Sequence, residues 1–268
     1  MKTRTRFKDL PEFVNHLQSV GRYSFSRTEA EAATGNKGGA LRKALWRLED
    51  RKRVRMARRG FYVIVPLEYS RTGIVPPDWF IADLMQYLKR PYYVGLLSAA
   101  AIHGASHQQP QEFHVVVPEA ERDIRIEGLQ IRFFKKSNMG SSPTTEAKTS
   151  TGYMRIADPA VTAIDLVVYN KRVGGLDRVL TVLQELGESI NPKMLIAAAK
   201  MEKNLSDLQR LGFLLEKAQR PDLVTSLADW ISRQKPKRAP LDPALPREGY
   251  PRDLRWNVIM NTDIEGEL

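Results

Sequence analysis

The stretch SRTEAEAATGNKGGALRKALWRLEDRKRVRMARRGFYVIV, residues 26–65, determines the expected fold of the N-terminal region. Ser26 and Glu29 have the spacing of a capping box, in which each side chain binds the main-chain amide of the other residue at a helix start. This helix ends at Gly35, and a third helix runs from the turn 35–39 to about Lys52. Together, these signals predict two consecutive helices joined by a tight turn.

The segments on either side complete the pattern. Apolar residues recur at helical spacing over 9–20, which predicts a first helix, and residues 23–25 form a short extended stretch. Two extended runs, 54–57 and 61–65, flank an Arg-Arg-Gly turn and predict a hairpin with arginines at its tip. Helix, strand, two helices and hairpin in this order predict a winged helix-turn-helix.

The third helix has two different faces. Its apolar face, with Leu41, Leu45 and Leu48, is expected in the core, and we expect Trp46 to pack under the hairpin. Its opposite face carries a row of cations with one aromatic residue, Trp46, as a helix in the DNA major groove requires. The predicted DNA contacts lie on this face, at the start of the second helix and on the hairpin: Ser26, Arg27, Thr28, Lys37, Arg42, Lys43, Arg47, Arg55, Arg58 and Arg59. A protein-interaction role for the same module remains an alternative.

The distribution of charge supports a nucleic-acid partner. The chain has 42 Lys and Arg, 31 Asp and Glu, and a formal net charge of +11. Residues 1–60 contain 16 of these basic residues and 6 of the acidic ones, whereas residues 61–268 contain 26 and 25. Because nearly all of the excess lies in the first sixty residues, the expected partner of that region is a polyanion, most simply double-stranded DNA.

The remaining chain predicts an α+β fold. Helices are expected at 78–88 and 92–103, a small antiparallel sheet from strands at 113–117, 123–126, 129–134 and 153–156, and a polar loop at 137–150. A helix capped by Asp158 follows, and a helical lobe runs to residue 234 with breaks at 191–192 and 220–221. The predicted domains are 1–70, 71–234 and a proline-rich basic tail, 235–268, expected to be an extended arm whose apolar residues 256–260 dock.

No pattern in the sequence indicates catalysis, and we expect neither cofactor nor metal. The chain lacks cysteine, nucleotide-binding loops and G-x-S-x-G. His103 and His107 have the spacing of two ligands on a helix, but Gly104 interrupts it. Asp158 and Asp165 could form a carboxylate pair, although a helix cap and a polar contact explain them equally well. Without a long apolar run, a cytoplasmic protein is expected.

Several motifs, in their order along the chain, resemble the AbiEi antitoxin family. After the predicted winged helix come YVGLLSAA at 93–100, His103-Gly104, Asp158-Pro159 with Thr162 and Asp165, and RLGFLLE at 210–216. The resemblance spans most of residues 8–234. It implies an autorepressor and antitoxin of a type IV toxin–antitoxin, or abortive infection, operon. Such a protein binds inverted repeats in its own promoter and counteracts a nucleotidyltransferase-like toxin, directly or indirectly.

Two other functions remain open from the sequence. One is a winged-helix regulator that senses a small ligand or a protein through its C-terminal domain. The other is a nucleic-acid-processing enzyme that docks through the winged helix, for which no specific motif is present.

Overall fold

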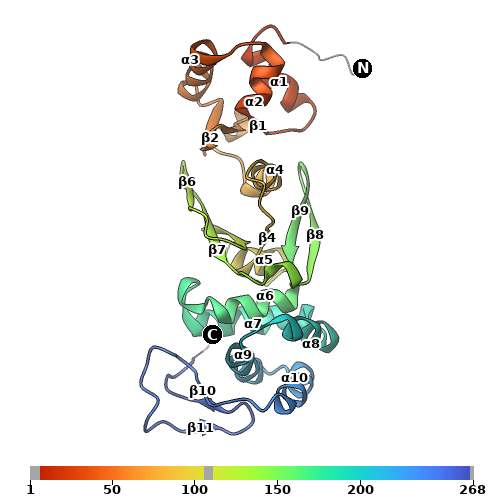
Figure 1. The fold of residues 1–268 in the computed structure, drawn as a ribbon, viewed down its shortest axis with the longest axis vertical. Coiled ribbons are helices and arrows are strands. Elements are labelled where there is room, and N and C mark those ends of the chain that lie inside the picture. The colour runs from red at the N-terminus through yellow and green to blue at the C-terminus, as the bar shows by residue number, and fades with distance from the viewer. Residues whose placement is uncertain (1–6, 106–110, 266–268) are drawn as a thin grey trace.

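The computed structural model describes residues 7–105 and 111–265. The molecule is elongated, with the N-terminal helices at one end, a curved sheet in the middle and helices beyond it (Figure 1). The C-terminal segment lies beside α9 (Leu205–Lys217) and α10 (Pro221–Arg233) at the far end. Helices and several sheets together give the mixed α+β fold that the sequence predicts.

The N-terminal elements follow the predicted order and form a three-stranded antiparallel sheet, β1-β3-β2, beside three helices. Their core unites Leu10 and Phe13 of the first helix with Leu41 and Leu45 of the third. The element bounds are α1 (Leu10–Ser19), β1 (Ser24–Ser26), α2 (Arg27–Thr34), α3 (Gly38–Asp50), β2 (Val54–Arg58) and β3 (Phe61–Ile64).

The predicted capping box is present at the start of α2. The Ser26 hydroxyl accepts a hydrogen bond from the Glu29 amide at 3.1 Å, and the Glu29 carboxylate accepts one from the Ser26 amide at 2.6 Å. Gly35 ends the helix in the left-handed region, with φ of 74°, a conformation that favours glycine. Local sequence signals therefore fix both ends of α2.

The region after the hairpin differs from the single helix expected at 92–103. Two 3₁₀ turns, η1 (Leu67–Tyr69) and η2 (Pro77–Trp79), precede α4 (Ile81–Tyr87). A short strand, β4 (Tyr93–Val94), then leads into α5 (Leu96–Ile102). Tyr93 and Val94 are fully buried, and the strand that they form pairs with a neighbouring strand on each side, which stabilises the extended conformation that their residue types favour.

The expectation of a small antiparallel sheet is wrong, because the sheet has more strands than expected and some of them pair in parallel. Six strands form one mixed sheet in the order β6-β7-β5-β4-β9-β8, in which β5 pairs with β7, and β4 with β9, in parallel. The predicted loop at 137–150 contains η3 (Met139–Ser141) and an edge strand. The remaining strands are β5 (Glu112–Val117), β6 (Ile124–Ile126), β7 (Leu129–Lys135), β8 (Thr144–Thr149) and β9 (Gly152–Ala157).

Helices cover one side of this sheet layer, and α6 is central to them (Figure 1). Nine of its residues are buried because it packs against α5, α7, α8 and α9. The predicted breaks are confirmed, since Pro192 and Pro221 each begin a helix. The elements are α6 (Pro159–Val168), η4 (Asn170–Arg172), α7 (Gly175–Leu186), η5 (Gly187–Ser189), α8 (Pro192–Met201), α9 (Leu205–Lys217) and α10 (Pro221–Arg233).

The segment after residue 234 is folded, so the extended arm that we expected is wrong. β10 (Ala239–Pro240), β11 (Arg252–Asp253) and β12 (Val258–Ile259) form a small sheet in the order β10-β12-β11. Trp256 is fully buried, as its apolar surroundings predicted, and donates a hydrogen bond from Nε1 to Glu216 at 2.5 Å. The docking of Trp256 on α9 orders a sequence that its prolines alone would leave extended.

Candidate nucleic-acid interface

The outward side of α3 carries four of the predicted residues, Lys37, Arg42, Lys43 and Arg47, which we call the α3 basic face. All four side chains are exposed, while the leucines of the opposite side are buried in the N-terminal core. Within residues 7–105 and 111–265, none of the four forms a salt bridge. The α3 basic face is therefore available to an anionic partner.

Two grooves flank α3, so that the helix stands out between them. One groove, of about 590 Å³, lies between α3 and the β2–β3 hairpin and brings together Arg27, Thr28, Arg42 and Arg59. The other, of about 500 Å³, lies between α1 and α3 and is lined by Lys43 and Arg47, among others. A protruding helix with grooves on both sides has the shape required to enter a DNA major groove.

Trp46 does not pack under the hairpin, so that expectation is wrong. Its side chain is 63% exposed and lines the groove between α3 and β2. Leu41, Leu45 and Leu48 already fill the core side of α3. Position 46 falls on the outward side, and the indole consequently lies among the cations.

The start of α2 is largely occupied by contacts within the chain. Arg27 donates its amide to the Gly60 carbonyl at 2.7 Å, and its side chain forms a salt bridge with Glu31 at 3.1 Å. The Ser26 hydroxyl is engaged in the capping box. Arg27 and Thr28 are exposed beside the groove, so their side chains, rather than the helix amides, are presented to the outside.

Two of the predicted hairpin arginines face the sheet instead of solvent. Arg58 forms a salt bridge with Glu121 at 3.2 Å and also donates to the carbonyls of Arg122 and Asp123. Arg55 forms a salt bridge with Glu127 at 2.9 Å, and its side chain is only 13% exposed. Glu121 lies between β5 and β6 in the chain, and Glu127 lies between β6 and β7. These arginines therefore join the hairpin to the sheet.

Further contacts fix the N-terminal region against α4. The Tyr87 hydroxyl donates to the Arg59 carbonyl at 2.9 Å, and the Ser24 hydroxyl donates to the Asp83 carboxylate at 2.5 Å. The Arg59 side chain remains exposed. Among the three arginines predicted on the hairpin, Arg59 is therefore the one directed toward the α3 side.

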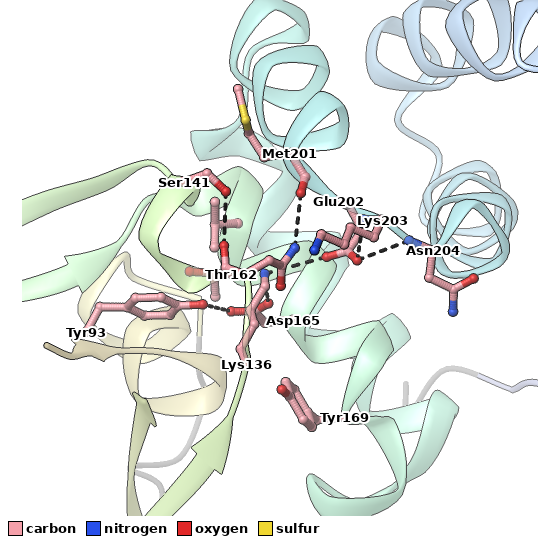
Figure 2. A network of polar contacts seen from close by, with 12 residues as sticks. Tyr93, Lys136, Ser141, Thr162, Asp165, Tyr169, Met201, Glu202, Lys203 and Asn204 are labelled. Atoms are coloured by element: carbon pink, nitrogen blue, oxygen red, sulfur yellow. Dashed lines mark hydrogen bonds and ion pairs between the residues drawn. The ribbon is translucent and has the colours of Figure 1, made fainter. Parts of the chain in front are cut away.

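A buried polar network connects the sheet to the helices (Figure 2). Asp165 of α6 is fully buried, pairs with Lys136 at 2.7 Å and accepts a hydrogen bond from the Tyr93 hydroxyl at 2.7 Å. Glu202 contacts the same ammonium at 3.6 Å. Burial raises the pKa of the Asp165 carboxyl, while the Lys136 ammonium opposes that rise.

The residues weighed for catalysis have structural partners. Asp158 caps α6, where its carboxylate accepts from the Val161 amide at 2.7 Å. His103 contacts the Ala157 carbonyl through Nε2 at 2.8 Å, and His107 lies outside the described residues. Among the residues that the structure describes, no group of three potential ligands could hold a metal ion. No helix among them has the length and apolar character needed to cross a bilayer.

Sequence reasoning missed the contribution of Lys136, Glu202 and Tyr93 to this network. The three residues are far apart in the chain, and each lies near the end of an element rather than in a local motif. The RLGFLLE motif, in contrast, has a clear structural role. Arg210 pairs with Asp207 at 2.5 Å and donates to the Pro240 carbonyl at 2.8 Å, so the motif holds the C-terminal segment.

Residues 93–217 match the model of the AbiEi antitoxin C-terminal domain. They comprise the strands from β4 to β9 and the helices up to α9, including the network around Asp165. The predicted resemblance to the AbiEi antitoxin family is thereby confirmed, and this part of the chain is similar to an AbiEi-type antitoxin domain. The domain supports an antitoxin role in a toxin–antitoxin system.

Solved structures extend the comparison of folds. The crystal structure of the RV2827C protein from Mycobacterium tuberculosis has a TM-score of 0.66 and 12% identity, over 96% of this chain and 92% of that chain. At this identity the likeness shows the fold alone. An antigenic nucleotidyltransferase-like protein from Paracoccidioides brasiliensis has a TM-score of 0.31 and 12% identity, over 55% of this chain and 88% of that chain. No curated protein matches the sequence significantly.

Proposed function

We propose that the chain is an antitoxin and transcriptional autorepressor of a type IV toxin–antitoxin system. Residues 1–70 form a winged helix-turn-helix domain that binds inverted repeats in the protein's own promoter. The observation that carries the DNA-binding part is the α3 basic face, which is exposed and makes no salt bridge with a described residue. In this domain α3 is the recognition helix and the β2–β3 hairpin is the wing.

The DNA contacts divide into two groups in this proposal. Lys37, Arg42, Lys43 and Arg47 enter the major groove or bind the phosphates at its edges, and Arg27, Thr28 and Arg59 bind phosphates across the neighbouring groove. Ser26 acts by capping α2, while Arg55 and Arg58 position the wing against the sheet through their carboxylate partners. These roles refine the set of contacts that the sequence alone predicted.

A footprint on the protein's own promoter tests the DNA-binding part. The full chain is expected to protect two inverted half-sites, because recognition helices of paired copies read successive major grooves. Repression of a reporter driven by the same promoter should be lost when the half-sites are scrambled. Absence of protection at low salt, where electrostatic contacts are strongest, would overturn the proposal.

The antitoxin part rests on the match of residues 93–217, and the proposed target is a nucleotidyltransferase-like toxin encoded beside this chain. Co-expression of the chain from an unrelated promoter should restore growth of cells that produce the toxin. A variant with Arg42, Lys43 and Arg47 changed to Ala should restore growth equally well, because the antitoxin domain is unchanged. Failure of the wild-type chain to restore growth would refute the antitoxin role.

A cleft in the antitoxin domain favours a second candidate function, the sensing of a small ligand. It has a volume of about 380 Å³, and its lining combines apolar side chains such as Phe113 and Met154 with the charged Asp78, Glu112 and Lys148. Under this alternative, small molecules extracted from the host cells would release the chain from its promoter. Ala101→Phe, which fills the cleft, would abolish that release, whereas an unchanged response would exclude the cleft as the sensor.

A further inference from the structure

Two large apolar side chains are exposed in the groove between α3 and the hairpin. Trp46 of α3 is 63% exposed, and Met56 of β2 is 50% exposed. Both line the same groove of about 590 Å³. We call these two residues the groove pair.

The fold gains little from the groove pair. The core beneath α3 is filled by Leu41, Leu45 and Leu48, and β2 contributes Val54 and Ala57 to buried clusters. An indole left mostly in water does not realise the stabilisation that its burial would provide. An exposed apolar pair that the core does not use is typical of a contact surface.

The surroundings of the groove pair indicate an anionic partner. Arg27, Arg42 and Arg59 line the same groove, and the half-buried Glu49 is the acidic residue among its lining. Lys43 and Arg47 lie on the other side of α3. A protein partner for so basic a groove would need to be strongly acidic, whereas DNA offers phosphates around base edges of mixed polarity.

An apolar side chain at a base edge has a specific counterpart in DNA. The C5 methyl group of thymine is the apolar group that the major groove presents, and neither phosphates nor guanine offers an equivalent. We propose that Trp46 and Met56 contact thymine methyl groups in the operator and are therefore specificity-determining residues. This inference rests on the proposed DNA binding, in which the α3 basic face supplies affinity and the groove pair selects thymine.

The test uses the full chain and the promoter segment that it protects, synthesised with thymine or with uracil, which lacks the methyl group. Burial of one methyl group contributes about 0.8 kcal/mol, which corresponds to about fourfold in affinity. The wild-type chain should therefore bind the uracil duplex about fourfold more weakly for each methyl group contacted. Equal binding of both duplexes would overturn the inference.

Variants test whether Trp46 and Met56 are responsible for the discrimination between thymine and uracil. Trp46→Ala and Met56→Ala should bind the thymine duplex more weakly and should lose most of the preference over uracil. Tyr153→Ala removes an aromatic side chain that is 62% exposed on β9 and serves as the matched control, with an unchanged preference expected. If both groove-pair variants still prefer the thymine duplex, other residues recognise the thymine methyl groups, and the inference is contradicted.

The possible outcomes distinguish a failure of this inference from a failure of the proposed DNA binding on which it rests. If the chain does not bind its promoter at all, the proposed DNA binding fails. If binding depends on Arg42, Lys43 and Arg47 but is equal for thymine and uracil, DNA binding stands and the role of the groove pair is wrong. If Trp46→Ala leaves DNA binding unchanged and instead weakens self-association, the groove pair belongs to a protein interface, and the inference is likewise overturned.

Discussion

Lys136 and Arg210 in the AbiEi-like region, residues 93–217, are buried and paired with aspartates, whereas Arg42 and Arg47 on α3 are exposed and form no salt bridge with a described residue. The two regions thus use the same residue types for different purposes. Residues 61–268 nearly balance their charges, and many of those charges meet within the fold. Cations that meet no carboxylate inside the molecule are the ones to examine for an external partner.

Glycines show the same difference. A Cβ atom added at Gly212 of α9 would lie 2.0 Å from the Trp256 ring, so the C-terminal segment requires glycine there. A Cβ atom added at Gly39 of α3 would have no neighbour within 4 Å, although glycine weakens a helix. Packing against Trp256 explains Gly212, whereas no packing contact explains Gly39, which is the second residue of α3, beside the proposed DNA-binding surface.

Removal of a buried partner should have the largest effect. Asp165→Ala leaves Lys136 with only the more distant Glu202 and leaves the Tyr93 hydroxyl without its acceptor. The free energy of unfolding should fall by about 3–5 kcal/mol, as measured by denaturant titration. Arg47→Ala is the counterpart on α3 and should change stability by less than about 0.5 kcal/mol. If the two substitutions changed the free energy of unfolding equally, the contrast between buried, paired charges and exposed cations without a salt bridge would be wrong.

Acid should destabilise the AbiEi-like region through His114. Burial lowers the pKa of this imidazole to about 4, although Glu112 at 3.4 Å partly opposes the shift. The neutral form is therefore favoured in the folded state, and its stabilisation is complete above the unfolded pKa near 6.5. As the pH falls from about 6.5 to 4, about 3 kcal/mol of stability should be lost. His114→Gln should reduce that loss, while His16→Gln, at an exposed position, should retain it.

Gly212→Ala should destabilise the docking of the C-terminal segment by about 1–3 kcal/mol, because the added methyl group overlaps the Trp256 ring. The effect should be much smaller in a Trp256→Ala background, where the ring is absent. Thermal or denaturant unfolding of the four chains measures this coupling. Additive effects would show that Gly212 and Trp256 act independently.

Gly39→Ala should have the smallest effect on stability and the opposite sign. It should stabilise α3 by at most about 0.5–1 kcal/mol, because alanine is the better helix former and no described residue packed against this position obstructs it. Promoter affinity should nevertheless fall, since the added methyl group lies on the surface that we propose to face DNA. A variant that gains both stability and affinity would argue against close approach at this position.

The sequence predicts those parts of the fold that depend on signals within a few neighbouring residues. Caps such as Ser26, Asp158 and Asn191 act within a few residues, so the helices that they begin were predicted well. The sequence does not predict β4, because its extended conformation depends on partners distant in the chain, and it does not predict β8, because that strand lacks apolar alternation although its partner β9 follows directly. β4 is held between β5 and β9, and β8 is a polar edge strand.

The same dependence on local sequence signals applies to the candidate site. The exposure of Arg42, Lys43 and Arg47 follows from helical phase alone and was predicted. The carboxylates that hold Arg55 and Arg58 lie more than sixty residues further along the chain, and no local pattern announces them. Trp46 was misplaced because an aromatic residue is ordinarily buried, whereas three leucines already fill the core side of α3.

The most direct test of the central claim is the salt dependence of promoter binding for three full-length chains. One is the wild type, one has Arg42, Lys43 and Arg47 changed to Ala, and one has the exposed Lys193, Lys200 and Arg233 changed to Ala. Both variants lose the same charge. The slope of log affinity against log salt should fall by up to about 2.7 for the α3 variant, with a large loss of affinity, and should be unchanged for the control. Equal slopes in the two variants would contradict the account, because net charge, and not the α3 basic face, would then govern binding.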